Sequence, residues 1–346
     1  MAAPSMNWKA VMLYIEEAMP ATSPTCFGLH PNAEIGFRMA QSLDLFKNIL
    51  ELQPRSSISG GGAMTVQEKA HTASEEIVER LSEIRFEWRE ICDRVEDRNP
   101  YTNVFLQEIE RMIALIHVLR SSLHELELGL RGDLTMTAGM EAVMNCLCVD
   151  KVPTVWEKCA YPSLRPLGLW VRNLLDRCKQ LMDWVGDMQL PKCTWISGFF
   201  NPQSFLTAVM QSTARRMDWP LDKTMIQTDV TKKQPDDVAL ASRDGVFVFG
   251  LELEGARWDD KAGNGSLEVS RSRELYSTLP VILVKAVPQE KLEHRDAYCC
   301  PVYKTTLRGP TYVFSAYLRT KVPPETWVLA GVAMIMDIGT GSPFGT

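Results

Sequence analysis

The chain has 346 residues, 45% of them hydrophobic, and carries a formal net charge of −6. This apolar content can fill the cores of about two ordinary domains, so large-scale disorder is not expected. The negative charge argues against a nucleic-acid partner, because a phosphate backbone requires a basic surface. The longest apolar run, Trp327 to Met336, is about half of the roughly 20 residues that a bilayer requires, so no membrane partner is expected.

Nine cysteines occur without a recognisable secretory leader, which predicts free thiols and a reducing, cytoplasmic location. The spacing Cys146-x-Cys148 lacks the second pair that zinc sites use. His117 and His124 would stand about 10 Å apart along a helix, too far to share a metal ion. No metal site is therefore expected.

The first part of the sequence has apolar residues at steps of three and four, the spacing of a helix with one buried face. Such stripes predict helices over residues 32–52, 77–95, 105–130 and 164–185. Pro100 separates the second from the third, and Gly132 ends the third. A sustained stripe also fits a free-standing coiled coil, but these breaks favour an intramolecular helical bundle.

After about Pro191 the apolar period changes to two, which is typical of half-buried strands. Within residues 247–253, every second position is occupied by a large apolar residue: Phe247, Phe249, Leu251 and Leu253. Further strands are predicted within residues 280–288, 298–305, 311–320 and 326–336, and one helix over 203–217. The sequence therefore predicts an α+β fold, with an N-terminal helical bundle followed by an antiparallel sandwich or closed β-barrel that contains one inserted helix.

Three consecutive glycines at 60–62 raise the question of a phosphate-binding loop. Such a loop requires G-x-x-x-x-G-K-[ST] between a strand and a helix, whereas Lys69 is the first lysine after these glycines. A flexible hinge between two helices is the simpler interpretation. No nucleophile elbow occurs either, and we expect no catalytic residue and no cofactor-binding residue.

Several stretches resemble the C-terminal region of dynein heavy chains, in the same order along the sequence. They are SPTCFGLHPNAEIGF, WISGFFNPQSFLTAVMQSTARRMDWPLDK, GLELEGARWD, CPVYKTTLRGPTYVF and WVLAGVA. The resemblance runs from about residue 14 to 338. The sequences LELEGARWD and RGPTYVF are more similar to axonemal heavy chains, especially the outer-arm type, than to cytoplasmic ones.

This resemblance implies an arrangement of domains. Residues 1–23 would form the end of the lid of the sixth ATPase module, 24–190 the helical bundle, and 191–338 a β-barrel cap. The tail, 339–346, departs from the usual ending of the family and is either an expression scar or a natural extension.

The resemblance also implies a function. The chain would be a non-catalytic part of a microtubule motor, lying across a ring of six ATPase modules and modulating how ATP turnover is coupled to movement. ATP and magnesium would belong to the modules, and microtubule contact to a stalk outside this chain. The expected partners are the ATPase modules of the same heavy chain, and other dynein subunits, in the axoneme of a cilium or flagellum. The alternative is a stand-alone ligand-binding or enzymatic β-barrel.

Physical roles can be assigned to residues of two matched motifs. In GLHPNAEI, Gly28 would provide a turn, Pro31 would hold His30 extended, and Asn32 would cap the next helix.

In WISGFFNPQSF, Asn201 would cap a helix, with Pro202 in its first turn. Gly198 would permit a bend that turns Phe199 and Phe200 outward. A structural role is the simplest interpretation of all these residues. If any of them contacts the ring, the two phenylalanines are the best candidates, because aromatic side chains dominate interfaces.

Overall fold

The computed structural model describes residues 7–17, 24–52, 65–96, 98–260, 265–292 and 296–339. The glycines at 60–62 lie outside this set. The helices are α1 Trp8–Glu17, α2 Pro31–Leu52, α3 Val66–Ser82, α4 Trp88–Arg94, α5 Pro100–Arg131, α6 Ala138–Cys148, α7 Thr154–Glu157, α8 Leu167–Asp187, α9 Pro202–Met217 and α10 Pro324–Leu329. The strands are β1 Cys193–Trp195, β2 Thr224–Val230, β3 Val246–Phe249, β4 Glu252–Glu254, β5 Ala256–Asp259, β6 Ser266–Val269, β7 Tyr276–Thr278, β8 Ile282–Pro288, β9 Ala297–Thr305, β10 Tyr312–Arg319 and β11 Ala333–Asp337.

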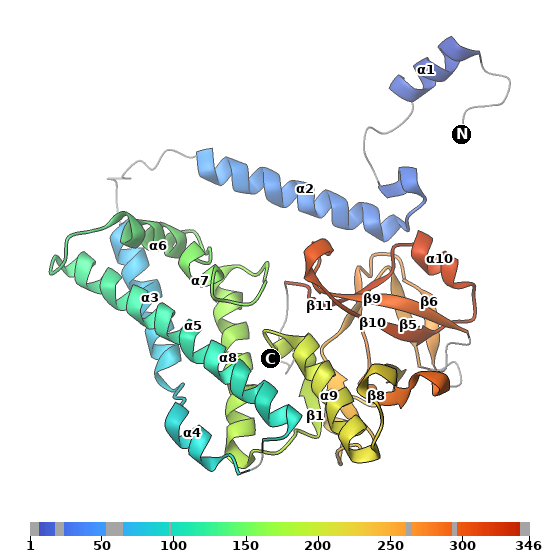
Figure 1. The fold of residues 1–346 in the computed structure, drawn as a ribbon. Helices are drawn as coiled ribbons and strands as arrows, with labels where there is room; N and C mark the ends of the chain where they lie inside the picture. Colours follow the sequence, from blue (N-terminus) through green and yellow to red (C-terminus); the bar gives the residue numbers. More distant parts are fainter. Residues whose placement is uncertain are drawn as a thin grey trace.

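Helices and strands form two neighbouring groups, so the predicted α+β class is confirmed (Figure 1). The long helix α5 is central to the helical group and packs against α3, α6, α8 and α9. Both ends of α5 lie where local sequence signals predict them. The Asn99 side chain accepts the backbone N–H of Thr102 at 2.9 Å, Pro100 occupies the first turn, and Gly132 ends the helix with φ of 84°.

The predicted helix over 77–95 is wrong in one respect, because it is two helices, α3 and α4, with a break after Ser82. Arg120 on α5 explains the break. Its guanidinium donates to the carbonyls of Leu81 and Ile84 at 2.7 and 2.8 Å, so the open carbonyls at the end of α3 are satisfied without another helical turn. Helices α6 and α7 were not predicted.

Helix α2 forms where the sequence predicts it, but it does not join the bundle. Figure 1 shows it as a rod outside both groups. Its apolar side chains Met39, Leu43 and Phe46 are 53, 66 and 63% exposed. The prediction that this stripe faces other helices of the bundle is therefore wrong.

The strands form sheets with the orders β1-β3-β8-β2, β10-β9-β11-β4-β7 and β5-β6. Within the described residues none of these sheets closes on itself, so a barrel is not what the structure contains. The pairing is not purely antiparallel either, because β1 runs parallel to β3 and β11 runs parallel to β9. Helix α9 interrupts the strands as predicted.

The predicted strand over 326–336 begins as helix α10 instead, and only its second half is a strand, β11. Two prolines at 323 and 324 fit the first turn of a helix. The Trp327 indole is buried and donates to the hydroxyl of Thr320 at 2.7 Å, which holds α10 against the sheet.

One cluster of buried apolar residues extends from α3 to β11, through both groups. At its centre the Phe105 ring stacks on Trp184 at 4.8 Å between centroids and meets Phe199 edge-on at 5.5 Å. Phe199 in turn stacks on Phe205 at 4.9 Å. Aromatic packing thus joins α5 and α8 to α9, which in turn packs against β2 and β8. The boundary near residue 191 stays a prediction.

Candidate functional site

The segment Trp195–Asn201, here called the connector, joins β1 to α9 through a short 3₁₀ turn at Ile196–Gly198. It lies between the helical group and the sheets. Side chains from the helical group and from the sheets form hydrogen bonds with its backbone. Gln180 on α8 accepts the N–H of Trp195 at 2.9 Å and donates to the carbonyl of the same residue at 3.2 Å.

Two side chains of opposite charge, the buried Glu108 and the half-buried Lys304, hold the end of the connector. Glu108 on α5 accepts the backbone N–H groups of Phe200 and Asn201, the latter at 3.0 Å. Lys304 on β9 donates to the Phe200 carbonyl at 2.8 Å. Burial raises the pKa of Glu108 above 4.5, against the opposing effect of the two N–H groups, and burial lowers the pKa of Lys304.

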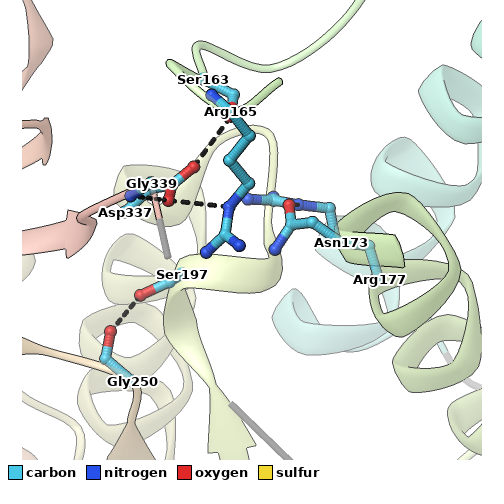
Figure 2. Close-up of polar contacts among 8 residues, drawn as sticks. All are labelled: Ser163, Arg165, Asn173, Arg177, Ser197, Gly250, Asp337 and Gly339. Atoms are coloured by element: carbon cyan, nitrogen blue, oxygen red, sulfur yellow. Dashed lines mark hydrogen bonds and ion pairs between the residues drawn. The ribbon is translucent and has the colours of Figure 1, made fainter. Parts of the chain in front are cut away.

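Arg177 on α8 is buried beside the connector. Its Nε donates to Asn173 at 2.8 Å (Figure 2) and its Nη1 reaches the Phe199 carbonyl at 3.4 Å. The guanidinium carbon lies 3.5 Å from the centre of the Tyr161 ring, a cation–π contact. Burial lowers the pKa of Arg177, and the surrounding acceptors and ring compensate for part of the desolvation.

A buried ion pair ties the loop before α8 to β11 (Figure 2). Arg165 Nε lies 2.9 Å from Asp337 Oδ1, and the two side chains are only 7 and 5% exposed. Asp337 also accepts from Ser163 and from the backbone of Gly339, each at 2.9 Å. Figure 2 also shows Ser197 donating to the Gly250 carbonyl, which fastens the connector to the turn before β4.

The motif residues of the connector have structural roles that differ in part from those predicted. Pro202 does occupy the first turn of α9, but the Asn201 side chain makes no cap, and only its backbone is held. Gly198 is required for close approach, since an added Cβ would lie 2.5 Å from the Trp195 ring and 2.8 Å from Gln180. Phe199 and Phe200 are 3 and 8% exposed. Both side chains point into the protein, so the prediction that they turn outward is wrong, and we no longer expect them to contact a partner.

Glu108, Arg177 and Lys304 were not singled out from the sequence. A signal for two of them was available, because Glu108 and Arg177 interrupt apolar helical stripes, at positions where a charge is buried.

Three matched motifs meet at Arg308, in the RGP turn before β10. Arg308 Nη2 donates to Glu254 of LELEG at 2.6 Å and to the Gly331 carbonyl of WVLAGVA at 2.8 Å. Its backbone has φ of 55° and ψ of −138°, a conformation that L residues rarely adopt. Leu29 of the GLHPNAEI motif reaches the same place, with its Cδ2 3.7 Å from the position of a Cβ on Gly331.

Asn32 does not cap α2. Its side-chain amide donates to the carbonyls of Arg271 and Glu274 at 2.7 and 2.8 Å, and its oxygen accepts the N–H of Arg273 at 2.8 Å. It therefore fastens α2 to the loop before β7.

The cap is supplied by His30, whose Nδ1 accepts the Asn32 N–H at 3.1 Å. Pro31 occupies the first residue of α2, and Gly28 has φ of 75°, as a turn there requires.

Within the described ranges, no three His, Cys, Asp or Glu side chains gather as a metal site would require. No helix of the described residues combines the length and the apolar character of a membrane span.

Comparison with known proteins accounts for the motifs. The sequence profile of the C-terminal domain of dynein heavy chains matches residues 39–336. The chain belongs to the dynein heavy chain family. It is 51% identical over 335 residues to the flagellar outer-arm dynein beta chain of Chlamydomonas reinhardtii, covering 96% of this chain and 7% of that protein. It is 48% identical to the ciliary dynein beta chain of Heliocidaris crassispina (97 and 8% covered), and 47% identical to human dynein axonemal heavy chain 9 (96 and 7% covered).

These dyneins are flagellar, ciliary and axonemal, so the predicted resemblance to the axonemal class is confirmed. The protein is the C-terminal region of an axonemal dynein heavy chain, a component of the axonemal cytoskeleton. It spans only 7 to 8% of the length of these relatives.

Proposed function

We propose that this chain is a non-catalytic region that packs across the ring of ATPase modules of its own heavy chain and modulates the coupling of ATP turnover to movement. The proposal rests on the resemblance for the ring itself. The observation that carries it is the exposed apolar face of α2.

That face gathers Ile35, Met39, Leu43 and Phe46 at helical spacing, with Leu45 and Ile49 beside them, and most of these side chains are about half exposed or more. A contiguous apolar face of this kind is uncommon on a monomeric protein unless it binds a partner. The rest of the heavy chain is the natural partner, because it is linked covalently to this region.

The polar contacts between the helices and the sheets support the modulatory part of the proposal. The ion pair between Arg165 and Asp337 joins the loop before α8 to β11, and Glu108 and Lys304 hold the same connector backbone from α5 and from β9. A force applied to α2 would therefore be transmitted through a closely packed body that does not deform gradually. A body that contacts two moving modules interacts differently with each ring state, and such coupling is typically about 1 to 3 kcal/mol. ATP and magnesium would be bound by the modules, and other dynein subunits are possible further partners.

The test is the double substitution Leu43→Glu and Phe46→Glu in the full-length heavy chain. Charges on this face should weaken its docking, and therefore change microtubule-stimulated ATPase and single-molecule movement. ATP affinity should change much less, because the phosphate contacts would lie elsewhere. The control is Asn48→Glu, on the opposite face of α2.

If the double variant moves like the wild type, or if Asn48→Glu has the same effect, α2 is not the docking face. If ATP affinity collapses while movement per ATP is unaltered, the region supports a nucleotide site and the modulatory role is wrong.

A further inference from the structure

A small pocket lies at the seam between two sheets. Strands β2 and β10 are each the last strand of their sheet, and they face one another without forming a ladder. The hydroxyl of Thr228 bridges the seam, accepting the Tyr317 N–H at 2.9 Å. Beside this bridge the seam opens into a pocket of about 260 Å³, lined by residues 228–232 and by Trp258, Tyr317 and Arg319.

The charges of this pocket are unbalanced. The carboxylate in its lining, Asp229, is paired with Lys285 Nζ at 2.6 Å and also accepts from Gln227. Lys232 and Arg319, at the mouth, have no acidic partner among the residues that the structure describes. The whole protein carries a net charge of −6, so this positive mouth is a local feature that can attract an anionic group.

The remaining lining fits a peptide. The pocket is smaller than the roughly 300 to 1,000 Å³ of typical small-molecule sites, and is sized for one or two side chains. Thr231 donates its backbone N–H to Val281 at 2.9 Å, so the alternation of an antiparallel ladder turns the backbone groups of Val230 toward the seam. A peptide that lies across the pocket can hydrogen-bond to these groups of Val230.

We propose that this seam pocket binds an extended acidic peptide segment. A Glu or Asp carboxylate lies between Lys232 and Arg319, its aliphatic stem lies against Trp258 and Tyr317, and its backbone bonds to Val230. The planar guanidinium of Arg319 suits a carboxylate, which it can bind with two parallel hydrogen bonds. This binding is independent of the docking of α2.

The experiment measures binding of the 346-residue protein to a fluorescent peptide in which glutamate alternates with serine. The same peptide with glutamine is compared, and inorganic phosphate is added as a competitor. Lys232→Glu and Arg319→Glu should each weaken binding about fivefold, and the double variant should bind more weakly than either, with binding falling as salt rises.

The control is Lys233→Glu, which changes the net charge equally at the next position. Lys233 Nζ lies 5.5 Å from the centre of the Phe247 ring and does not line the pocket. Unchanged thermal melting shows that each variant is folded. Failure of the wild type to bind the glutamate peptide at millimolar concentration, equal binding of the glutamine peptide, equal loss in Lys233→Glu, or phosphate competing as well as the peptide would each overturn the proposal.

Discussion

The Glu108 carboxylate on α5 holds the backbone N–H of Asn201 at 3.0 Å, and the two residues are 93 positions apart in the sequence. The same carboxylate holds Phe200, whose carbonyl is bound by Lys304 of β9. The end of the connector is therefore held by two charged side chains, a buried one from the helices and a half-buried one from the sheets. The helical group and the sheets share one set of hydrogen bonds at this point, and loss of one member leaves the others unpaired.

Glu108→Ala should destabilise the protein by about 3 kcal/mol, because two buried N–H groups lose their acceptor and Lys304 loses its counter-charge. Glu108→Gln keeps one acceptor oxygen and should cost about half as much. Urea denaturation measures both values. The control is Glu110→Ala, on the exposed side of α5, which should change stability by less than about 0.5 kcal/mol. Equal effects at 108 and 110 would show that the carboxylate is not needed.

Glu108 also predicts a pH dependence. Burial raises its pKa above 4.5, so the folded state binds this proton more tightly than the unfolded state does. Its contribution to stability is largest below pH 4.5 and is lost as pH rises through the folded pKa. The free energy of unfolding of the wild type, relative to Glu108→Gln, should therefore fall as pH is raised from about 4 to about 7. A difference that stays constant or grows with pH contradicts this assignment.

Features of the fold that depend on neighbouring residues could be predicted from the sequence, whereas features that depend on distant residues could not. The apolar stripe of α5, Asn99 before it and Gly132 after it are local signals, and the helix begins and ends where they indicate. The break between α3 and α4 depends on Arg120, about 40 residues further on, and no local signal reveals it.

The site was less predictable than the helices. Asn32 has the sequence position of a cap, yet its amide is used by residues 271–274, which a local rule cannot foresee. The alternating strands predicted sheets, but closure into a barrel would require β2 and β10 to pair. They are joined instead by a side-chain bridge from Thr228 to Tyr317, which the pattern of either strand does not reveal.

Gly198→Ala should destabilise the protein by about 2 kcal/mol, because the new methyl group overlaps the Trp195 ring in a buried site. Gly186 offers the matched control. It lies inside α8 with nothing within 4 Å of an added Cβ, so Gly186→Ala should stabilise by up to about 1 kcal/mol. Thermal melting compares the two. Opposite signs are expected, and a neutral Gly198→Ala would mean that the connector yields to the methyl group.

Asn32→Ala should free the start of α2 from the sheets, since three hydrogen bonds to residues 271–274 are lost together. Amide hydrogen exchange should rise at Arg273, whose N–H loses its acceptor, and in the first turn of α2. Asn32→Asp should be worse, because a carboxylate would face the carbonyls of Arg271 and Glu274. The control is Asn48→Ala, further along α2. If exchange at Arg273 is unchanged in both Asn32 variants, the side chain does not hold this loop.

Arg308 predicts an unusual order of stabilities. Arg308→Ala and Arg308→Gly both remove the bonds to Glu254 and to the Gly331 carbonyl, and each should be less stable than the wild type by about 2 kcal/mol or more. Alanine keeps the rare backbone conformation at φ of 55°, whereas glycine adopts it without strain. Arg308→Gly should therefore be more stable than Arg308→Ala by about 1 kcal/mol, the reverse of their usual order in ordered segments. Chemical denaturation of the two variants side by side measures this difference. If alanine proves the more stable, the turn relaxes when the side chain is removed, and the strain belongs to the bonds that Arg308 makes and not to the turn itself.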